Sequence, residues 1–410
     1  MYSINVFARI SNVLIMKRRD FVKNTALGSS LFLVPSFVKA FEEVTAKTLG
    51  VKRLVIVQLS GGNDGLNTIV PFRNDLYYKN RPTIAIQKNN LLKLDDEIGL
   101  HASLQPMKRL YDNGYLSIIN NVGYPNPNRS HFRSTDIWQT ASNSNEYLQS
   151  GWIGRYLDNY GEMAHNAIEV DESLSLAMKG NNINGIATTD AKRLYRTSQD
   201  PYFKKVMRLN NEHLNEHNLG YLYKTMIAAE SSAKYIYEKT KTFSSRQAYP
   251  NNSFAKQLKT IAEFINSGLK TSIYYTSLDG FDTHANQSNI QTRLLKNYAE
   301  SIEVFVKDLK ENNTFRDTLI LTFSEFGRRV KQNAANGTDH GTANNVFIIG
   351  EDLKTQGLYN DIGSLEDLDE NGDLKFEIDF RTIYATVLNK WLQVDDKVVL
   401  NRSYNQLDFI

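Results

Sequence analysis

Several acidic, imidazole and hydroxyl side chains of this 410-residue chain follow or lie between predicted strands, where they could do chemistry together. They are Asp64, Ser130, Asp282, His284, Glu325, Asp339 and His340. Because the carboxyl ends of parallel strands share one edge of a sheet, these side chains could meet there. Carboxylates and imidazoles without thiolates suit Zn²⁺, Mn²⁺, Mg²⁺ or Ca²⁺, and a serine or a water beside such an ion could be activated as a nucleophile. The alternative is that these residues only hydrogen-bond loops together, without a metal.

Asp64 follows the most strand-like stretch of the chain. Residues 54–59 are apolar and rich in β-branched side chains, which is typical of a strand buried on both faces. Gly61 and Gly62 permit a sharp turn and close approach of the backbone. We therefore expect Asn63 and Asp64 at the sheet edge, with Asn63 as a substrate-binding residue. The alternative is a turn that merely uses Asn-Asp-Gly chemistry.

The loop that leads to Ser130 carries basic side chains. Prolines within residues 123–128 enforce an extended loop, and Ser130 then has the position of a helix N-cap. A hydroxyl at a helix N-terminus is well placed to meet an anion, because free N–H groups and the helix dipole both point toward it. Arg129, His131 and Arg133 flank this hydroxyl and favour an anion-facing loop, with Arg129 and His131 binding substrate. The alternative is that Ser130 is only a cap.

The elements that must position these residues alternate between buried strands and helices. We expect strands at residues 54–59, 116–122, 166–170, 272–278, 318–323 and 346–349, and helices at residues 101–111, 130–138, 151–157, 290–311 and 379–391. This strand–helix–strand spacing predicts an α/β fold with a mostly parallel sheet and right-handed crossovers. Long polar helices between about residues 181 and 270 predict an α-helical insertion or cap against the sheet.

Composition narrows the chemistry. Hydrophobic residues make up 41% of the chain and charged residues 23%, as in a soluble globular protein. A formal net charge of +3 without a dense Lys/Arg tract gives no argument for nucleic acid as a partner. The absence of cysteine excludes disulfides, thiolate metal sites and cysteine nucleophiles.

Residues 17–40 have the pattern of an export signal. A basic segment at residues 17–23 precedes an apolar stretch at 25–37 and a small-residue site that ends at Ala40. Its paired arginines, followed by Phe21, resemble a twin-arginine signal. We predict a signal at residues 1–40, with Met16 as an alternative start, and a mature domain at residues 41–410 that is periplasmic or secreted. The export machinery would be a partner. The apolar stretch is short and broken for a membrane span, and a retained anchor is the alternative.

Five segments of the chain resemble the exported family called domain of unknown function 1501. They are residues 58–68, 123–132, 151–155, 324–328 and 338–341. The resemblance extends over nearly all of the mature chain. That family is itself similar to the alkaline phosphatase/sulfatase superfamily, which implies a three-layer α/β/α sandwich carrying a two-metal hydrolytic site.

The resemblance also implies roles for individual residues. Asp64 resembles the superfamily's first-strand metal carboxylate, and Ser130 resembles its helix-capping nucleophile. Asp282 and His284 resemble its aspartate–histidine metal pair, although two positions separate them here where four are usual. His340 resembles the final histidine ligand.

The second metal position matches the superfamily less well. Where the superfamily often has Asp-His, this chain has Glu325 followed by Phe326, and a phenylalanine cannot bind a metal. Asp339, beside His340, is a further candidate ligand. One ion, two ions or none therefore stay open.

The favoured hypothesis is an exported metal-dependent hydrolase of sulfate or phosphate esters, acting on an anionic small molecule or glycan. Ser130 would attack or position the ester, the metal would stabilise developing negative charge, and Arg129 or Arg328 would bind substrate oxygens. The alternative is a hydrolase-like protein with a degenerate site that binds an anionic glycan or a partner protein. A redox protein that loads a cofactor before export has no support from any cysteine or GxGxxG segment.

Overall fold

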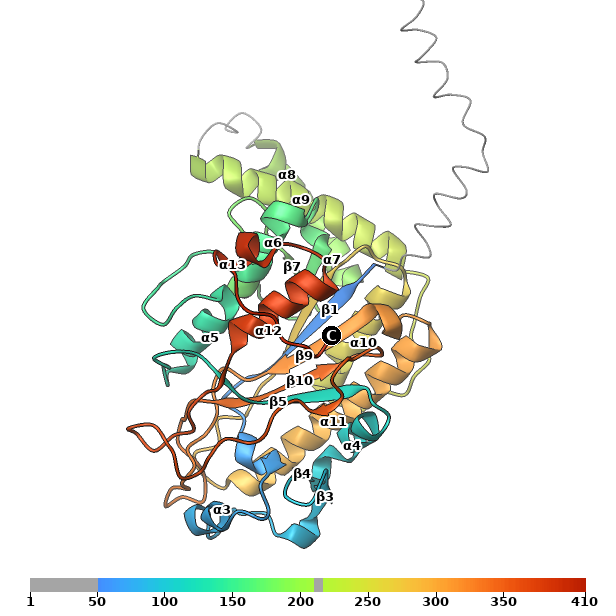
Figure 1. Cartoon of the computed structure of the whole chain (residues 1–410). Coiled ribbons are helices and arrows are strands. Elements are labelled where there is room, and N and C mark those ends of the chain that lie inside the picture. Colours follow the sequence, from blue (N-terminus) through green and yellow to red (C-terminus); the bar gives the residue numbers. More distant parts are fainter. Residues whose placement is uncertain (1–50, 210–216) are drawn as a thin grey trace, which may run out of the picture. The chain divides into compact units, whose positions relative to one another are not determined.

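A nine-stranded mixed sheet forms the centre of the part of the chain that the structure describes, residues 51–209 and 217–410 of a computed structural model (Figure 1). The predicted signal at residues 1–40 lies outside these described residues. In spatial order the strands are β11 (Gly357–Leu358), β5 (Leu116–Gly123), β10 (Asn344–Ile349), β9 (Thr318–Phe323), β1 (Arg53–Leu59), β8 (Ile273–Leu278), β6 (Ala167–Glu169) and β7 (Ile186–Ala187), and β12 (Ile378–Asp379) pairs with β5. The long apolar runs of β1, β5 and β9 are buried along their whole length, as expected for central strands.

Strand β10 is antiparallel to both of its neighbours, β9 and β5, whereas the other described pairings in this sheet are parallel. The start of β10 therefore lies at the edge where the parallel strands end. The segment just before β10, residues 338–343, reaches this edge together with the segments that follow β1, β8 and β9. This arrangement brings His340 to the same side of the sheet as Asp282.

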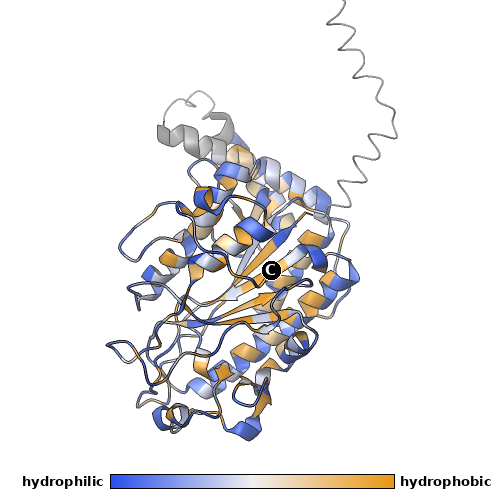
Figure 2. Cartoon of the chain, viewed as in Figure 1, coloured by the Kyte–Doolittle hydropathy of each residue, from blue (hydrophilic) through white to orange (hydrophobic). Residues whose placement is uncertain are grey.

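Helices cover both faces of the sheet. One face packs against α4 (Gln105–Asp112), α9 (His217–Thr240), α10 (Ser253–Asn266) and α11 (Gln287–Glu311), and the other packs against α5 (His131–Thr140), α6 (Trp152–Tyr160), α12 (Phe380–Thr386) and α13 (Asp396–Leu400). Side chains of β1 alternate between the two cores, with Val55 and Val57 on the first face and Leu54 and Ile56 on the second. Figure 2 shows hydrophobic residues concentrated in the central strands. The predicted α/β/α sandwich with a mostly parallel sheet is confirmed.

The described residues between 181 and 270 are mostly helical. Helices α7 (Ala191–Ser198) and α8 (Pro201–Leu209) precede α9 and α10 in this stretch. Helix α10 packs against β8 and α11, and its buried side chains, such as Phe254 and Leu258, join the core. Helix α10 is thus part of one layer of the sandwich rather than of a separate cap.

Several local elements were not predicted. The stretch after β1 forms a small antiparallel sheet of β2 (Ile69–Val70), β4 (Gly99–His101) and β3 (Leu91–Lys93), with α3 (Asp75–Asn80) between β2 and β3. These strands are two or three residues long, too short to leave a period in the sequence. Strand β5 is also not adjacent to β1, because β9 and β10 lie between them.

Helix α12 continues as a π-helical turn at Val387–Trp391, which completes the last helix that the sequence predicted. Among the helices in the described residues, none combines the length and the apolar character that a membrane crossing requires.

Candidate metal centre

Three imidazoles meet at one carboxylate oxygen on the carboxyl edge of the sheet. The Nε2 atoms of His131, His284 and His340 lie 3.3, 3.0 and 3.1 Å from Oδ1 of Asp282. The ligand atoms of His131, Asp282 and His340 all lie within 4.8 Å of one another, and the Nε2 atoms of His284 and His340 are 2.9 Å apart. The four side chains are all partly exposed, so a solute can reach the cluster. We call these four residues the histidine cluster.

Each imidazole of the cluster is held through its other nitrogen. The three Nδ1 atoms face acceptors: His131 faces the Glu325 carboxylate at 2.8 Å, His284 faces the Asp339 carboxylate at 3.1 Å, and His340 faces the Arg129 carbonyl at 2.7 Å. Metal-binding histidines in proteins are typically anchored in this way, by a carboxylate or carbonyl on the nitrogen that does not bind the metal. The anchoring fixes the ring orientation and turns each Nε2 toward Asp282.

The hydrogen-bond partners of His284 and His340 favour a cation between the two rings. A backbone carbonyl can only accept, so Nδ1 of His340 carries the proton and its Nε2 presents a lone pair. The pKa of the Asp339 carboxyl is lowered, first by a hydrogen bond from Asn333, so this carboxylate also acts as an acceptor from Nδ1 of His284. Two Nε2 lone pairs then face each other at 2.9 Å, an arrangement that a shared metal ion would relieve.

The charges at the cluster fit the same interpretation. Burial alone would raise the pKa of Asp282, but the hydrogen bond from Arg328 and its positive charge hold the pKa well below its usual range. Burial lowers the pKa of His340, which favours the neutral imidazole that binds metals. The hydrogen bond to Glu325 raises the pKa of His131, so a proton and a metal would compete for this ring. Three imidazole nitrogens and one carboxylate oxygen form a donor set that suits Zn²⁺ and its first-row neighbours.

The histidine cluster borders an open depression of about 440 Å³ that also contains Phe132, Thr135 and Asp279. Phe132, in the first turn of α5, is 88% exposed at this depression. The depression thus leaves His131 and Asp282 accessible from solvent.

Ser130 has the N-cap position of α5 that the sequence predicted. Its side chain is exposed and makes no capping hydrogen bond, while its backbone N–H donates to Oδ1 of Asn128. The hydroxyl is therefore not used to stabilise the helix. It lies next in sequence to His131, the first residue of the cluster.

Asp64, expected to bind a metal, lies in a different environment. Its carboxylate forms a fully buried ion pair with Arg81 at 2.6 Å and also accepts a hydrogen bond from the side chain of Gln287. The guanidinium already supplies the positive charge that a buried carboxylate needs. The structure does not bring Asp64 into the histidine cluster, and this revises its expected role.

The substrate-binding residues expected from the sequence mostly contact the protein itself. The side chain of Arg328 is fully buried and donates to the carbonyls of Gly62 and Phe281 as well as to Asp282. Asn63 is 2% exposed and donates to the Thr68 hydroxyl.

Arg129 also lies in an internal network, because its guanidinium pairs with Asp369 at 3.2 Å and with Asp373. Of the four residues expected to bind substrate, His131 is thus the one that belongs to the cluster. Glu325 and Asp339, expected as ligands, orient the imidazoles of His131 and His284.

Close packing against the residues at the histidine cluster explains why glycines follow β1 at positions 61 and 62. A Cβ atom on Gly61, whose φ is +113°, would lie 2.4 Å from the backbone nitrogen of Asp282. A Cβ atom on Gly62, whose φ is +73°, would lie 2.4 Å from the ring of Phe326. Only glycine allows the turn after β1 to approach the segment that carries Asp282 so closely.

Phe326 occupies the position where the resemblance placed a second metal ligand. Its ring centroid lies 4.8 Å from that of His131 and 4.8 Å from that of His340. An apolar ring therefore packs against the cluster on this side. With Asp64 paired to Arg81, the described residues bring together one candidate metal-binding group at this edge.

A model of the protein family described as "Protein of unknown function (DUF1501)" matches residues 51–402. The chain belongs to this family. The membership predicted from the sequence motifs is therefore confirmed. No curated protein matches the sequence.

Several solved structures resemble this chain in fold at 10% to 12% sequence identity. The lipoteichoic acid synthase LtaP from Listeria monocytogenes has a TM-score of 0.41 at 10% identity, covering 87% of this chain and 77% of its own. The PsFucS1 sulfatase from Pseudoalteromonas sp. has a TM-score of 0.38 at 12% identity, covering 90% and 73%. The C-terminal periplasmic domain of EptC from Escherichia coli, in complex with Zn, has a TM-score of 0.36 at 12% identity, covering 73% of each chain. Nothing about the activity of this chain follows from likeness at this level.

Proposed function

We propose that this protein is an exported metal-dependent hydrolase of sulfate or phosphate esters, with one divalent metal held by His131, Asp282, His284 and His340. The observation that carries the proposal is the convergence of three imidazole Nε2 atoms on one oxygen of Asp282. Carboxylate and carbonyl acceptors already orient each imidazole from behind, as they do around metal-binding histidines.

When bound, a divalent metal polarises a phosphoryl or sulfuryl oxygen and lowers the pKa of a coordinated water. The residues of this chain would supply the rest of the site. Asp282 would offset the charge of the metal, and Arg328, buried behind it, holds the carboxylate in place. Glu325 and Asp339 would keep the imidazoles in the tautomer that leaves Nε2 free.

Ser130 is the proposed nucleophile or ester-positioning group. Its hydroxyl is free of capping contacts at the N-terminus of the ten-residue helix α5. The free N–H groups and the dipole of this helix favour negative charge at that position, as develops on an ester during hydrolysis. Next to Ser130, His131 would place the same helix terminus against the metal.

A second arginine replaces Arg328 as the candidate for binding substrate oxygens. Arg329 has 40% of its side chain exposed, and its backbone N–H donates to the Asp339 carbonyl at 3.0 Å. Its guanidinium lies 3.8 Å from Asp373, a contact loose enough to be exchanged for a substrate anion. We propose that Arg329 binds the anionic ester group.

Export rests on residues 17–40, whose pattern resembles a twin-arginine signal. In this proposal the mature protein works in the periplasm or outside the cell, where an anionic small molecule or glycan would be the substrate. A cleavage assay on the full chain, with Arg18 and Arg19 both changed to Lys, tests this part, since the change should block processing and export.

The metal is tested by elemental mass spectrometry on protein purified without chelator. We expect about one equivalent of a divalent metal per chain in the wild type and less than about a tenth of that in Asp282→Asn. Asp279→Asn is the matched control, because Asp279 borders the same depression three residues earlier but is outside the cluster. Wild-type protein without metal, and without a thermal shift on adding Zn²⁺ or Mn²⁺, would overturn the proposal.

Turnover is tested with the metal-loaded protein on 4-nitrophenyl sulfate and 4-nitrophenyl phosphate. Ser130→Ala should abolish hydrolysis while metal content stays at the wild-type value. If the wild-type protein hydrolyses neither ester but binds a partner protein or a glycan, the non-catalytic alternative is supported instead.

A further inference from the structure

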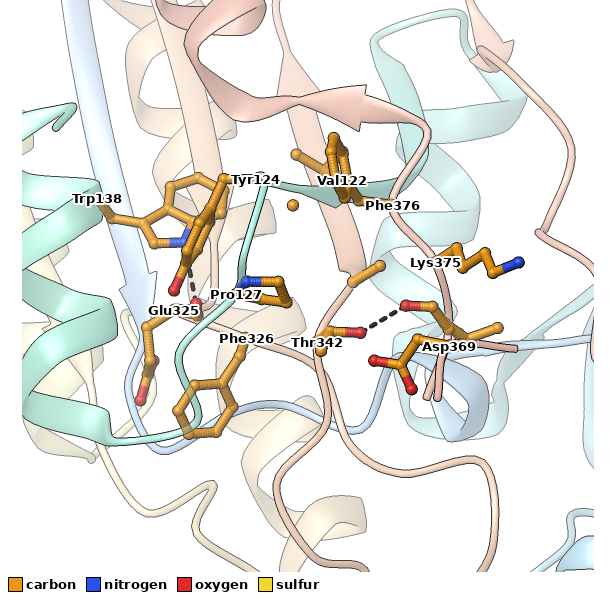
Figure 3. Close-up of a pocket in the computed structure, with 13 residues that line it drawn as sticks. Val122, Tyr124, Pro127, Trp138, Glu325, Phe326, Thr342, Asp369, Lys375 and Phe376 are labelled. Atoms are coloured by element: carbon orange, nitrogen blue, oxygen red, sulfur yellow. Dashed lines mark hydrogen bonds between the residues drawn. The ribbon is translucent and has the colours of Figure 1, made fainter. Parts of the chain in front are cut away.

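A second hollow of about 260 Å³ is lined in part by Phe326 (Figure 3), whose ring packs against His131 and His340 of the histidine cluster. Four aromatic side chains contribute to its wall: Tyr124, Trp138, Phe326 and Phe376. They come from segments far apart in the sequence that meet at the carboxyl edge of the sheet: the loop after β5, helix α5, the turn after β9 and the segment before β12. We call this hollow the aromatic cavity.

The polar groups at the wall of the aromatic cavity already have partners inside the protein. Nε1 of Trp138 donates to the Glu325 carbonyl at 2.9 Å, and the Thr342 hydroxyl donates to the Leu374 carbonyl (Figure 3). The Tyr124 hydroxyl is hydrogen-bonded to that of Ser134. The wall therefore offers mainly carbon surface, and a ligand rich in hydroxyl groups would lose hydrogen bonds with water and gain few in return.

The cavity opens toward solvent at one end. Asp369, Pro127 and Phe376 are half-buried, and Lys375 is exposed. In Figure 3 the side chains of Lys375 and Asp369 lie at the opposite side from Trp138. The end of the cavity beside Lys375 is therefore the end nearest to solvent.

The aromatic cavity and the histidine cluster are neighbours. Phe326 lines the cavity and also packs against the rings of His131 and His340, with centroid distances of 4.8 Å to each. Glu325 borders both the cavity and the open depression. The aromatic cavity and the histidine cluster therefore have Phe326 and Glu325 as common neighbours.

We propose that the aromatic cavity binds an aryl group of one or two fused rings. Resting on the proposed function, this aryl group would be part of the ester that the histidine cluster hydrolyses. The size fits, because an apolar cavity of about 150 Å³ already binds benzene. The chemistry fits as well, since aromatic walls favour edge and offset contacts with another ring. This assignment selects aryl sulfates or phosphates over sugar esters as the substrate class.

The cavity is tested first by binding alone, with 2-naphthol as the probe. Titration is followed by calorimetry and by tryptophan fluorescence, to which Trp138 in the wall contributes. Phe376→Ala removes one aromatic wall and should weaken binding about tenfold. Phe132→Ala is the matched control, because Phe132 is an exposed phenylalanine at the depression and not at the cavity. No binding by the wild type, or an equal loss in both variants, would overturn the proposal.

A second variant tests the cavity independently, in case Phe376→Ala does not fold. Val122 lies in the cavity wall (Figure 3), and Val122→Phe should fill the space. We expect 2-naphthol binding to be lost while cooperative thermal unfolding is retained. Binding at wild-type affinity in a folded Val122→Phe protein would contradict the location.

The experiments distinguish a wrong assignment of the aromatic cavity from a wrong assignment of the metal site. Asp282→Asn, without metal, should bind 2-naphthol like the wild type, because Asp282 does not line the cavity. On metal-loaded protein, 2-naphthyl sulfate and 2-naphthyl phosphate test the connection: Phe376→Ala should raise KM about tenfold with little change in kcat. Unchanged KM for both esters would overturn the link between cavity and catalysis.

Discussion

Asp64 and Asp282 follow neighbouring strands, β1 and β8, at the same edge of the sheet, yet their charges are balanced in different ways. Asp64 is buried and paired with the guanidinium of Arg81. Asp282 is half-exposed and surrounded by three imidazoles, with Arg328 behind it. An arginine supplies a permanent positive charge to its carboxylate, whereas imidazole nitrogens can bind a metal ion together with the carboxylate. The partners of a carboxylate, rather than its place after a strand, decide whether it can bind one.

A third carboxylate at the same edge, Glu169 at the end of β6, follows neither pattern. It is 4% exposed, and one of its oxygens accepts a hydrogen bond from the Ser175 backbone N–H at 2.7 Å. Burial raises the pKa of Glu169 to about 7. A proton therefore neutralises this group over much of the acidic pH range.

The largest effect on stability is expected from breaking the Asp64–Arg81 ion pair. Arg81→Met leaves the Asp64 carboxylate buried without its cation, and we expect it to lower the free energy of unfolding by about 3–5 kcal/mol. Urea denaturation measures this loss. Arg73→Met is the control, because Arg73 is exposed and donates to the Asp96 carbonyl; it should change stability by less than about 0.5 kcal/mol. Equal effects of the two variants would show that the buried pair is unimportant.

The raised pKa of Glu169 predicts a specific pH dependence of the free energy of unfolding. Its pKa in the folded protein, about 7, lies above its ordinary value, 4.5, so the folded state binds more protons between these two values. The group's contribution to stability is therefore present below about pH 4.5 and is lost as the pH rises through 7. Glu169→Gln should remove this loss and be more stable than the wild type at pH 8 by at most about 3 kcal/mol.

The measurement is urea denaturation of wild type and Glu169→Gln at pH 5 and pH 8. The two proteins should differ more at pH 8 than at pH 5. Glu172→Gln, whose side chain is two-thirds exposed, is the control and should show no such difference. A constant gap between wild type and Glu169→Gln at both pH values would contradict the prediction.

The anchoring of the imidazoles can be tested without removing a ligand. Asp339→Asn weakens the acceptor on Nδ1 of His284 and should reduce metal affinity about 10–100-fold. Competition with a fluorescent zinc chelator measures the affinity. Asp136→Asn, at the same depression but without contact to an imidazole among the described interactions, should leave it unchanged. A similar affinity in Asp339→Asn and wild type would argue against the tautomer assigned to His284.

The smallest effect on stability is expected at Ser130. An N-cap serine usually contributes about 1 kcal/mol, but the hydroxyl of Ser130 makes no capping bond, so Ser130→Ala should change stability by less than about 0.3 kcal/mol. Asn252→Ala is the comparison, because its side chain accepts from the Ala255 N–H and caps α10. A loss in Ser130→Ala as large as that in Asn252→Ala would show that Ser130 is an ordinary cap.

Much of the sheet could be predicted because its strands are long, apolar and buried on both faces. The same pattern placed Asp282, His284 and His340 at one edge, even before the direction of β10 was known. The contact of His131 with Asp282 could not be predicted, because it depends on how α5 approaches β8. The pairing of Asp64 with Arg81 was missed for a similar reason: the short helix α3, which ends just before Arg81, left no clear period in the sequence.

The orientation of the three imidazoles has a thermodynamic consequence. Each ring has lost its rotational freedom on folding, because its Nδ1 is already fixed by Glu325, Asp339 or the Arg129 carbonyl. An incoming ion meets a preorganised set of donors and does not have to order them, so little of its binding free energy is spent on side-chain entropy. Metal-free and metal-loaded protein should therefore share the same backbone around the site, and loading should be limited by proton release rather than by a change of shape.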